Sequence, residues 1–255
     1  MRHLSAASAN AWTMLPAEAT AELGAVTARF GLSLEISLTL ARLTELLADD
    51  EHAPTTVQEP GAVVRDHIAD SLEALRLEVV RGARTAVDLG SGAGFPALPL
   101  AIARPALSVV AVESVGRKAD FIARLARACA ADNLSVVARR AEELDQRERF
   151  DLVTARALAP LEVVAEYAAP LLRVGGSLVA WRGRRDPEAE ERAGLAAAEL
   201  GLQLGAVVEA IPYTGVAARH LHVLEKVAAT PPRFPRRPGM ARKRPLGRRS
   251  DRSQR

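Results

Sequence analysis

The sequence is poor in the residues on which several classes of protein depend. One cysteine, Cys129, occurs among 255 residues, which excludes an internal disulfide framework and a cysteine-based metal cluster. No apolar run approaches the roughly 18–20 residues that a membrane span requires, and no charged-then-apolar signal pattern opens the chain. We therefore expect a cytoplasmic protein without a membrane partner.

Motifs of several reaction classes are also missing. There is no Cys-x-x-Cys, no His-Glu-x-x-His, no Gly-x-Ser-x-Gly nucleophile elbow and no Gly-x-x-x-x-Gly-Lys phosphate loop. His220 and His222 share one face of an expected strand, but no third ligand is near them in the sequence, so we expect no metal site. Cys129 lies in a helical stretch and is expected to be a small buried thiol rather than a nucleophile.

What the chain does contain is apolar sequence for a sizeable core and an uneven distribution of charge. Hydrophobic residues make up 49% of it, and its length suits one large or two modest domains. Residues 231–255 include ten Arg or Lys and one acidic residue, whereas residues 1–230 include 24 basic and 30 acidic ones. A basic tail on an acidic body points to a polyanionic partner such as nucleic acid, and a merely solubilising tail is the alternative.

The first 80 residues show helical periodicity. Apolar residues recur at helical spacing over 17–30, 34–47 and 61–77. Gly31-Leu32-Ser33 separates the first two runs, with the serine as the expected N-cap, and a proline-containing loop precedes the third. We therefore predict an N-terminal helical cap over residues 1–80.

From residue 84 onward strands alternate with helices. Short apolar runs rich in β-branched residues predict seven strands, at 85–89, 107–112, 134–138, 150–155, 177–181, 203–211 and 221–227. Helical runs lie between most of them, at 96–103, 116–131, 161–172 and 187–200. This alternation predicts a parallel sheet with right-handed crossovers. The last two strands have only a turn between them and should pair as an antiparallel hairpin.

This order is typical of an α/β protein with the class I methyltransferase (Rossmann-like) fold, whose seven-stranded sheet is mostly parallel. We assign it to residues 81–228. Residues 229–255 are rich in proline and arginine and lack the apolar content for a core, so we predict a basic, disordered tail.

Three glycines at alternate positions follow the first strand. Gly90, Gly92 and Gly94 stand between Val87-Asp88-Leu89 and a helical run. Glycine is needed where φ is positive or where a ligand approaches without meeting a Cβ, and the N-terminus of the following helix favours a polar or anionic ligand group. The spacing is not the Gly-x-Gly-x-x-Gly dinucleotide fingerprint. Alone it fits a nucleotide-like ligand or a plain strand-to-helix turn equally well.

Polar residues follow the other strands, at the edge where open α/β sheets bind ligands. Glu113 ends the second strand and is either an acceptor for ribose hydroxyls or a surface charge. Ala141-Glu142 follows the third strand, where adenine would lie. Arg156 follows the fourth, where a guanidinium is able to bind a carboxylate or phosphate, with a solvated side chain as the alternative. His67 stands on a helix of the cap, and a structural role is the alternative to a catalytic one.

The same residues form six motifs whose order and spacing are distinctive. They are Arg65–Leu72, Asp88–Ile102, Glu113–Lys118, Arg140–Glu143, Arg156–Ala159 and Arg219–Leu221. In combination they resemble the RsmG (glucose-inhibited division protein B) family, whose members methylate N7 of a guanine in 16S ribosomal RNA. The resemblance runs from about residue 61 to about residue 226.

This resemblance implies S-adenosylmethionine as the cofactor and 16S rRNA, free or within the 30S ribosomal subunit, as the partner of a monomeric enzyme. The cofactor-binding residues that it implies are Gly90, Phe95, Ala141, Glu142 and Arg156. To these we add three residues at the ends of the first two strands, Gly92, Gly94 and Glu113. The catalytic residue stays unknown, and its candidates are His67, Asp70, Arg156 and Arg182. Two departures from the family pattern are an extra residue, Asp66, between Arg65 and His67, and an arginine at 182 where lysine is common.

The implied chemistry agrees with the missing motifs. Guanine N7 carries a lone pair and no proton, so its methylation needs no general base and depends mainly on positioning. A splayed base is expected to stack on an aromatic side chain such as Phe95 or Trp181. Two other functions stay open: a methyltransferase of the same fold that acts on a small molecule or protein, and an RNA-binding factor without catalysis.

Overall fold

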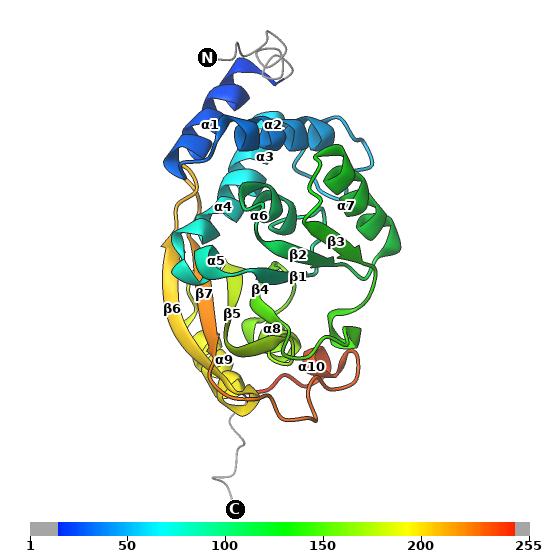
Figure 1. Cartoon of the computed structure of the whole chain (residues 1–255). Coiled ribbons are helices and arrows are strands. Elements are labelled where there is room, and N and C mark those ends of the chain that lie inside the picture. The colour runs from blue at the N-terminus through cyan, green and yellow to red at the C-terminus, as the bar shows by residue number, and fades with distance from the viewer. Residues whose placement is uncertain (1–14, 248–255) are drawn as a thin grey trace, which may run out of the picture.

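The computed structural model describes residues 15–247, and a seven-stranded sheet forms its centre (Figure 1). The strand order is β3-β2-β1-β4-β5-β7-β6. The strands are β1 (Thr85–Leu89), β2 (Ser108–Val112), β3 (Leu134–Val137), β4 (Phe150–Arg156), β5 (Leu172–Arg182), β6 (Leu202–Ala210) and β7 (Arg219–Lys226). The first five are parallel, and β7 is antiparallel to both β5 and β6. The predicted class I methyltransferase fold, with its closing hairpin, is confirmed.

Alternate side chains of the strands supply two hydrophobic cores, one on each face of the sheet, as the period of two along a strand requires. In β5, Val179 and Trp181 belong to one core, and Leu178 and Ala180 belong to the other. The central strands are therefore buried on both sides, which explains their continuous apolar sequence.

Helices cover both faces (Figure 1). One face packs against α1 (Ala17–Arg29), α2 (Leu34–Ala48), α6 (Ala97–Ala103) and α7 (Gly116–Ala128), and the other against α8 (Leu161–Ala168) and α9 (Pro187–Leu200). Ser33 caps α2 as predicted, because its hydroxyl accepts a hydrogen bond from the amide of Ile36 at 3.3 Å. Cys129, directly after α7, is buried as expected, and burial raises the pKa of its thiol to about 11.

The predicted helix over 61–77 is instead a chain of short helical pieces. They are α3 (Pro60–Val63), a π-helix (η3, Val64–Ala69), α4 (Asp70–Leu72), a 3₁₀-helix (η4, Glu73–Arg76) and α5 (Glu78–Gly82). A π-turn accommodates one residue more than an α-turn, and Asp66 is the residue that the sequence has in excess. Leu40 of the cap lies in the same core as Leu98 of α6, so the cap and the sheet share one hydrophobic core.

The prediction of a disordered tail from 229 onward is wrong for residues 229–247. This segment lies against the lower side of the sheet and includes α10 (Met240–Lys243) (Figure 1). Phe234 is 2% exposed and Ala241 is equally buried, so two apolar side chains within a basic, proline-rich sequence join the core and help to hold the segment in place. Residues 248–255, which complete the predicted tail, lie outside the described residues.

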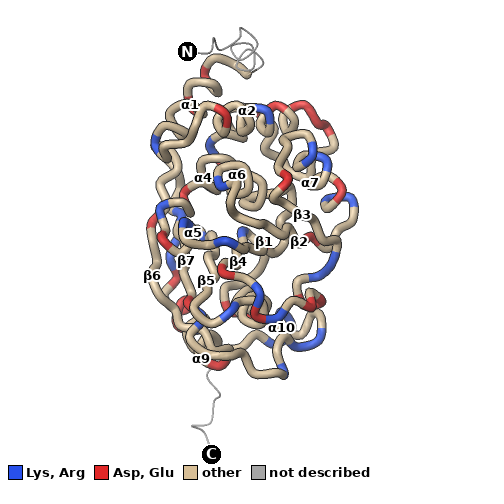
Figure 2. The backbone as a smooth tube through the Cα atoms, in the orientation of Figure 1, with Lys and Arg blue, Asp and Glu red and all other residues tan. Residues whose placement is uncertain are grey.

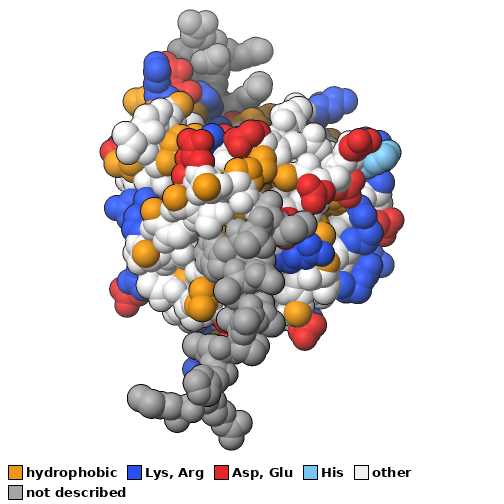
Figure 3. All heavy atoms as spheres, turned by 90° about the horizontal axis from the view of Figure 1, so that it is seen from above, with side chains coloured by type: hydrophobic (Ala, Val, Ile, Leu, Met, Phe, Trp, Pro, Cys, Tyr) orange, Lys and Arg blue, Asp and Glu red, His pale blue; other side chains and the backbone are white. Residues whose placement is uncertain are grey.

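Charged residues are spread differently over the two ends of the molecule. Lys and Arg are frequent around α10 (Figure 2), and the sequence there supplies them from Arg233 to Arg244. The face over the N-terminal helices shows acidic, basic and apolar side chains intermingled (Figure 3). Within residues 15–247, no helix is both long enough and apolar enough to cross a membrane.

Candidate active site

β1 is followed by a glycine turn. Its backbone conformation is one that residues with a side chain rarely adopt. Gly90, Gly92 and Gly94 have φ values of +70°, +60° and +99°. The amide of Gly90 donates to the carbonyl oxygen of Val112 at 2.8 Å, which ties the turn to the end of β2. A Cβ on Gly90 would lie 2.6 Å from Cδ1 of Leu158, so the turn also packs closely against the segment after β4.

Asp88 is buried directly before this turn. Its Oδ1 accepts a hydrogen bond from the hydroxyl of Thr154 at 2.7 Å, whereas Oδ2 makes no hydrogen bond of ordinary geometry within residues 15–247. Burial raises the pKa of the carboxyl to about 6. Hydrogen bonds to Ser91 and to the amide of Ala97 oppose this rise of the pKa, and because Asp88 is 1% exposed its carboxyl supports the turn from within the core.

Glu113 lies at the end of β2, where the ribose-binding carboxylate was predicted. Its carboxylate accepts hydrogen bonds from the amide of Gly92 at 3.0 Å and from the amide of Val115 at 2.9 Å, and the residue is buried. Glu113 therefore holds the glycine turn in place. A carboxylate oxygen accepts more than one hydrogen bond, so the ribose role stays a prediction.

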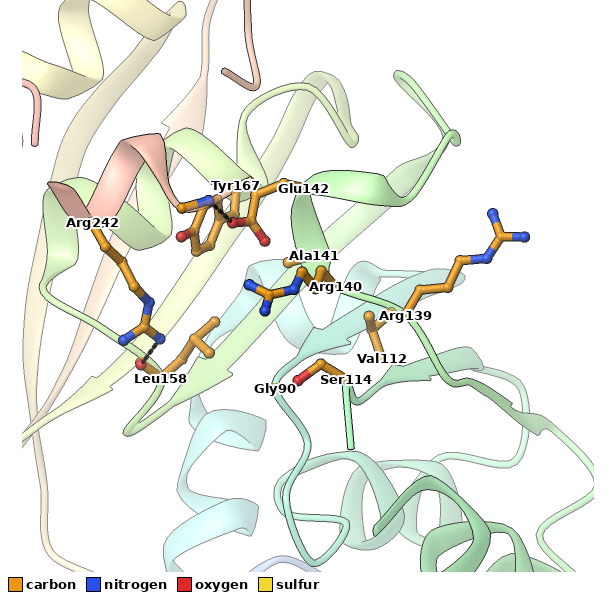
Figure 4. A pocket seen from close by; sticks show the side chains of 11 residues that line it. Gly90, Val112, Ser114, Arg139, Arg140, Ala141, Glu142, Leu158, Tyr167 and Arg242 are labelled. Atoms are coloured by element: carbon orange, nitrogen blue, oxygen red, sulfur yellow. Dashed lines mark hydrogen bonds between the residues drawn. The ribbon is translucent and has the colours of Figure 1, made fainter. Parts of the chain in front are cut away.

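A small cavity of about 100 Å³ opens beside the glycine turn (Figure 4). Gly90, Ala141 and Glu142 line it, the last two from a short 3₁₀-helix after β3 (η5, Ala141–Glu143). The other lining residues are Val112, Ser114, Arg139, Arg140, Leu158, Tyr167, Gly239 and Arg242. The structure thus brings together three of the predicted cofactor residues, from positions more than fifty residues apart in the chain.

Phe95 and Arg156 lie in a second cluster. The ring of Phe95 stacks on the imidazole of His67 with centroids 4.4 Å apart, and the guanidinium of Arg156 lies 5.7 Å from the same ring. Phe95 is also buried. Its face is therefore already covered by protein, and it is a poor partner for the expected stacking of an RNA base.

The imidazole of His67 contacts three groups. Its Nδ1 lies 3.1 Å from Nη2 of Arg156 and 3.2 Å from the backbone carbonyl oxygen of Asp66. Its Nε2 lies 3.0 Å from the hydroxyl of Thr55. Burial, together with the positive charge of Arg156, lowers the pKa of His67 to about 4. A neutral, doubly hydrogen-bonded imidazole holds Arg156 in position.

Asp70 is the second partner of Arg156. Its Oδ2 accepts from Nη1 of Arg156 at 2.8 Å, and its Oδ1 lies 3.4 Å from Nη1 of Arg219. The backbone carbonyl of Asp70 accepts from the indole N–H of Trp181 at 2.9 Å. Because the carboxylate is fully buried and faces two guanidinium groups, it fixes the geometry of both arginines.

A larger cavity, of about 360 Å³, lies on this side of the sheet edge. Trp181, Arg182 and Arg219 line it together with Asp70, Arg156, Ala157, Gly183, Ala217 and Ala218. Nη1 of Arg182 donates to the carbonyl oxygen of Ala159 at 2.8 Å. The residues after β4 thus separate the two cavities, since Ala157 faces the larger one and Leu158 the smaller one.

The inserted residue Asp66 belongs to the same network. Its carboxylate accepts from the hydroxyl of Tyr213 at 2.6 Å and from Nη2 of Arg219 at 2.9 Å, and its backbone carbonyl accepts from Arg156 at 3.0 Å. The π-helix therefore ties the loop between β6 and β7 to the site. Sequence reasoning noted Asp66 as a departure from a motif but did not identify these partners.

Sequence reasoning missed eight residues of the smaller cavity, among them Leu158, Tyr167, Gly239 and Arg242. Leu158 lies inside a motif that the sequence analysis identified, so its position two residues after β4 was an available signal. Tyr167 reads as one apolar position of a buried helix. Gly239 and Arg242 lie in the segment for which no structure was predicted.

Comparison with known proteins shows similarity to one family. The family described as "rRNA small subunit methyltransferase G" matches residues 40–221. The protein of that name from Chloroflexus aggregans is 41% identical over 213 residues, which cover 80% of this chain and 87% of the relative. The one from Deinococcus radiodurans is 42% identical over 215 residues, which cover 81% of this chain and 84% of the relative.

A solved structure gives independent support for the fold alone. The structure described as "StiE O-MT residues 961-1257" superposes with a TM-score of 0.51 at 13% sequence identity, and the match covers 63% of this chain and 74% of that one.

Proposed function

Since the chain belongs to the rRNA small subunit methyltransferase G family, we propose that it transfers a methyl group from S-adenosylmethionine to N7 of a guanine in 16S rRNA. The observation that carries the proposal is the pair of cavities at one edge of the sheet, separated by Ala157 and Leu158. We assign the smaller cavity to the cofactor and the larger one to the guanine.

The residues at the smaller cavity fit the cofactor. The glycine turn offers a surface without side chains. Ala141 and Glu142 lie where the adenine is expected, with Gly90 opposite them (Figure 4). The predicted contact between Arg156 and the carboxylate of the methionine part stays a prediction, because Arg156 lines the larger cavity. When bound, the cofactor supplies a methyl group on a positively charged sulfur.

The larger cavity fits a base that has left its stack. Trp181 lies in its wall with its N–H already bonded to Asp70, so the indole is held in one orientation. Both predicted stacking partners are buried, and Trp181 is favoured over Phe95 because Trp181 lines the cavity, whereas the ring of Phe95 is stacked on His67. Arg182 and Arg219 place positive charge at the same cavity, where phosphates of a splayed loop would be attracted.

The side chains need only to position the base. N7 has a free lone pair, so no proton has to be removed before methyl transfer. The neutral state of His67 agrees with a positioning role, because its Nδ1 is engaged by Arg156 and its Nε2 by Thr55. Holding the two reactants in line accounts for most of the rate enhancement that such a reaction requires.

Mass spectrometry of 16S rRNA tests the proposal. A strain that lacks this chain should lose one 7-methylguanosine from ribonuclease digests, and expression of the wild-type chain should restore it. The restored nucleotide, mapped by the digest, identifies the target. An unchanged 7-methylguanosine content would contradict the proposal and would favour a small molecule or protein as the substrate.

The form of the substrate is a separate part of the proposal. We propose a cytoplasmic, monomeric enzyme. Its substrate is either free 16S rRNA or the assembled 30S particle, and comparing the rates of methylation of the two distinguishes them. A faster reaction on naked rRNA would mean that the target loop is covered in the assembled particle.

A further inference from the structure

The segment after β7 returns across the lower side of the sheet, and we name residues 228–247 the C-terminal strap. Just before it, at the end of β7, the buried ammonium of Lys226 donates to the carbonyl oxygen of Ala169 at 2.6 Å and also to the hydroxyl of Thr230 in the strap. Arg147 donates to the carbonyl oxygen of Phe234 at 2.7 Å, and the Phe234 ring is buried. The first half of the strap is thus attached by backbone contacts and one aromatic side chain.

A buried ion pair anchors the middle of the strap. Arg236 donates from Nε and Nη2 to the two carboxylate oxygens of Glu166, at 2.8 and 2.5 Å, and its backbone amide donates to the same carboxylate at 3.1 Å. Glu166, on α8, is 1% exposed. Separating this pair would leave a buried charge without a partner, so the anchor strongly favours the docked position of the strap.

The second half of the strap reaches the smaller cavity. The amide of Gly239 donates to Oε1 of Glu142 at 3.0 Å, and Nη2 of Arg242 donates to the carbonyl oxygen of Leu158 at 2.8 Å (Figure 4). Gly239 and Arg242 both line the cavity. The strap therefore joins the 3₁₀-helix after β3 to the segment after β4 from the outside.

We infer that the C-terminal strap is the outer wall of the cofactor pocket and that Gly239 and Arg242 belong to the residues that bind the adenosine part of the cofactor. This inference rests on the proposed function. Arg242 uses one of its five donors on Leu158, so others are available for the acceptor atoms of a purine or ribose. The match to the family ends at residue 221, so these two residues lie beyond it.

The cavity is small for a whole nucleoside, since its volume of about 100 Å³ is below the roughly 300 Å³ at which small-molecule pockets begin. Arg242 is exposed and is held to Leu158 by a single hydrogen bond, whereas the opposite wall is built on the ends of β1 and β2. Because Glu166 anchors Arg236, we expect only the part of the strap after Arg236 to shift when a nucleoside binds.

The test measures binding of S-adenosylhomocysteine by isothermal titration calorimetry. Arg242→Ala should weaken binding about tenfold, the loss expected for one or two hydrogen bonds to a ligand. Arg233→Ala is the matched control, because Arg233 lies on the same strap, is exposed and pairs with Glu199 away from the cavity. Its affinity should stay equal to that of the wild type.

Amide hydrogen exchange of the wild-type chain gives a second readout that needs no variant. Addition of S-adenosylhomocysteine should slow exchange in residues 236–244. An Arg242→Ala variant with wild-type affinity, together with unchanged exchange in the strap, would overturn the inference while leaving the proposed function intact. Failure of the wild-type chain to bind S-adenosylhomocysteine would overturn the proposed function itself and the inference with it.

Discussion

The two cavities at the sheet edge are built by different means. One side of the smaller cavity is a glycine turn and the residues that follow β2 and β3, and the shape of this side follows from local sequence. The larger one depends on Asp70, Arg156 and Arg219, three charged residues from distant parts of the chain that hold one another in place. The comparison teaches that a site made of backbone is readable from sequence, whereas a site made of ion pairs requires the fold.

The largest expected effect comes from the glycine turn. Gly90→Val should abolish binding of S-adenosylhomocysteine, because a Cβ there meets Leu158 and a β-branched residue at a φ of +70° is strained. Calorimetry measures the loss. Gly24→Ala is the control, since nothing lies within 4 Å of the added methyl group.

A folded Gly90→Val variant with wild-type affinity would show that the cofactor does not approach this turn. Thermal unfolding of both variants distinguishes lost binding from lost folding.

The second effect concerns the ion pairs of the larger cavity. Arg156→Ala should lower the free energy of unfolding by about 3 kcal/mol, because it leaves the buried carboxylate of Asp70 with one arginine in place of two. It should also slow methylation of rRNA, because Arg156 lines the larger cavity. Urea denaturation and a filter-binding methylation assay measure these changes.

Arg182→Ala tests whether the two cavities are separate binding sites. Arg182 lines the larger cavity but not the smaller one, so its loss should reduce rRNA methylation and leave the affinity for S-adenosylhomocysteine unchanged. A variant that lost cofactor affinity instead would mean that the two cavities are not separate sites.

The smallest effect is a pH dependence that arises from His67. Its pKa is about 4 in the folded protein and 6.5 in the unfolded chain, so between these values the unfolded state binds more protons and stability falls as the pH is lowered. The stabilising contribution is complete above pH 6.5. Between pH 7 and pH 5 the wild type should lose about 2 kcal/mol more than His67→Gln.

Urea denaturation of both proteins at the two pH values measures this difference. Asp88 titrates in the opposite sense, since its pKa is raised to about 6. Asp88 is present in both proteins and its contribution cancels in the comparison. Equal pH dependence in the two proteins would show that His67 is not buried beside Arg156.

Most of the fold could be predicted because its signals are local. Strand runs, helical spacing and the closing hairpin follow from the order of apolar residues over short windows. The division of residues 60–82 into short helical pieces could not be predicted from the sequence. The π-turn there is stabilised by the distant partners of Asp66, which are Tyr213 and Arg219. The prediction for the strap was wrong for a related reason. Phe234 is buried, and Arg236 is paired with Glu166, only because α8 and the sheet lie against them.

Part of the candidate site was also predicted from local sequence, and part was not. Gly90, Ala141 and Glu142 meet at one cavity as the motif order implied. The pairing of Arg156 with Asp70 and His67, the role of Glu113 in bracing the turn, and the presence of Arg242 at the cavity were not predicted.

The sequence by itself determined the class I methyltransferase sheet, the glycine turn at its first strand and the family to which the chain belongs. Only the tertiary structure decided which charged groups face one another and which residues line the smaller cavity. The physical reason is that a turn or a strand depends on neighbours in the chain, whereas burial of a charge depends on every element that packs around it.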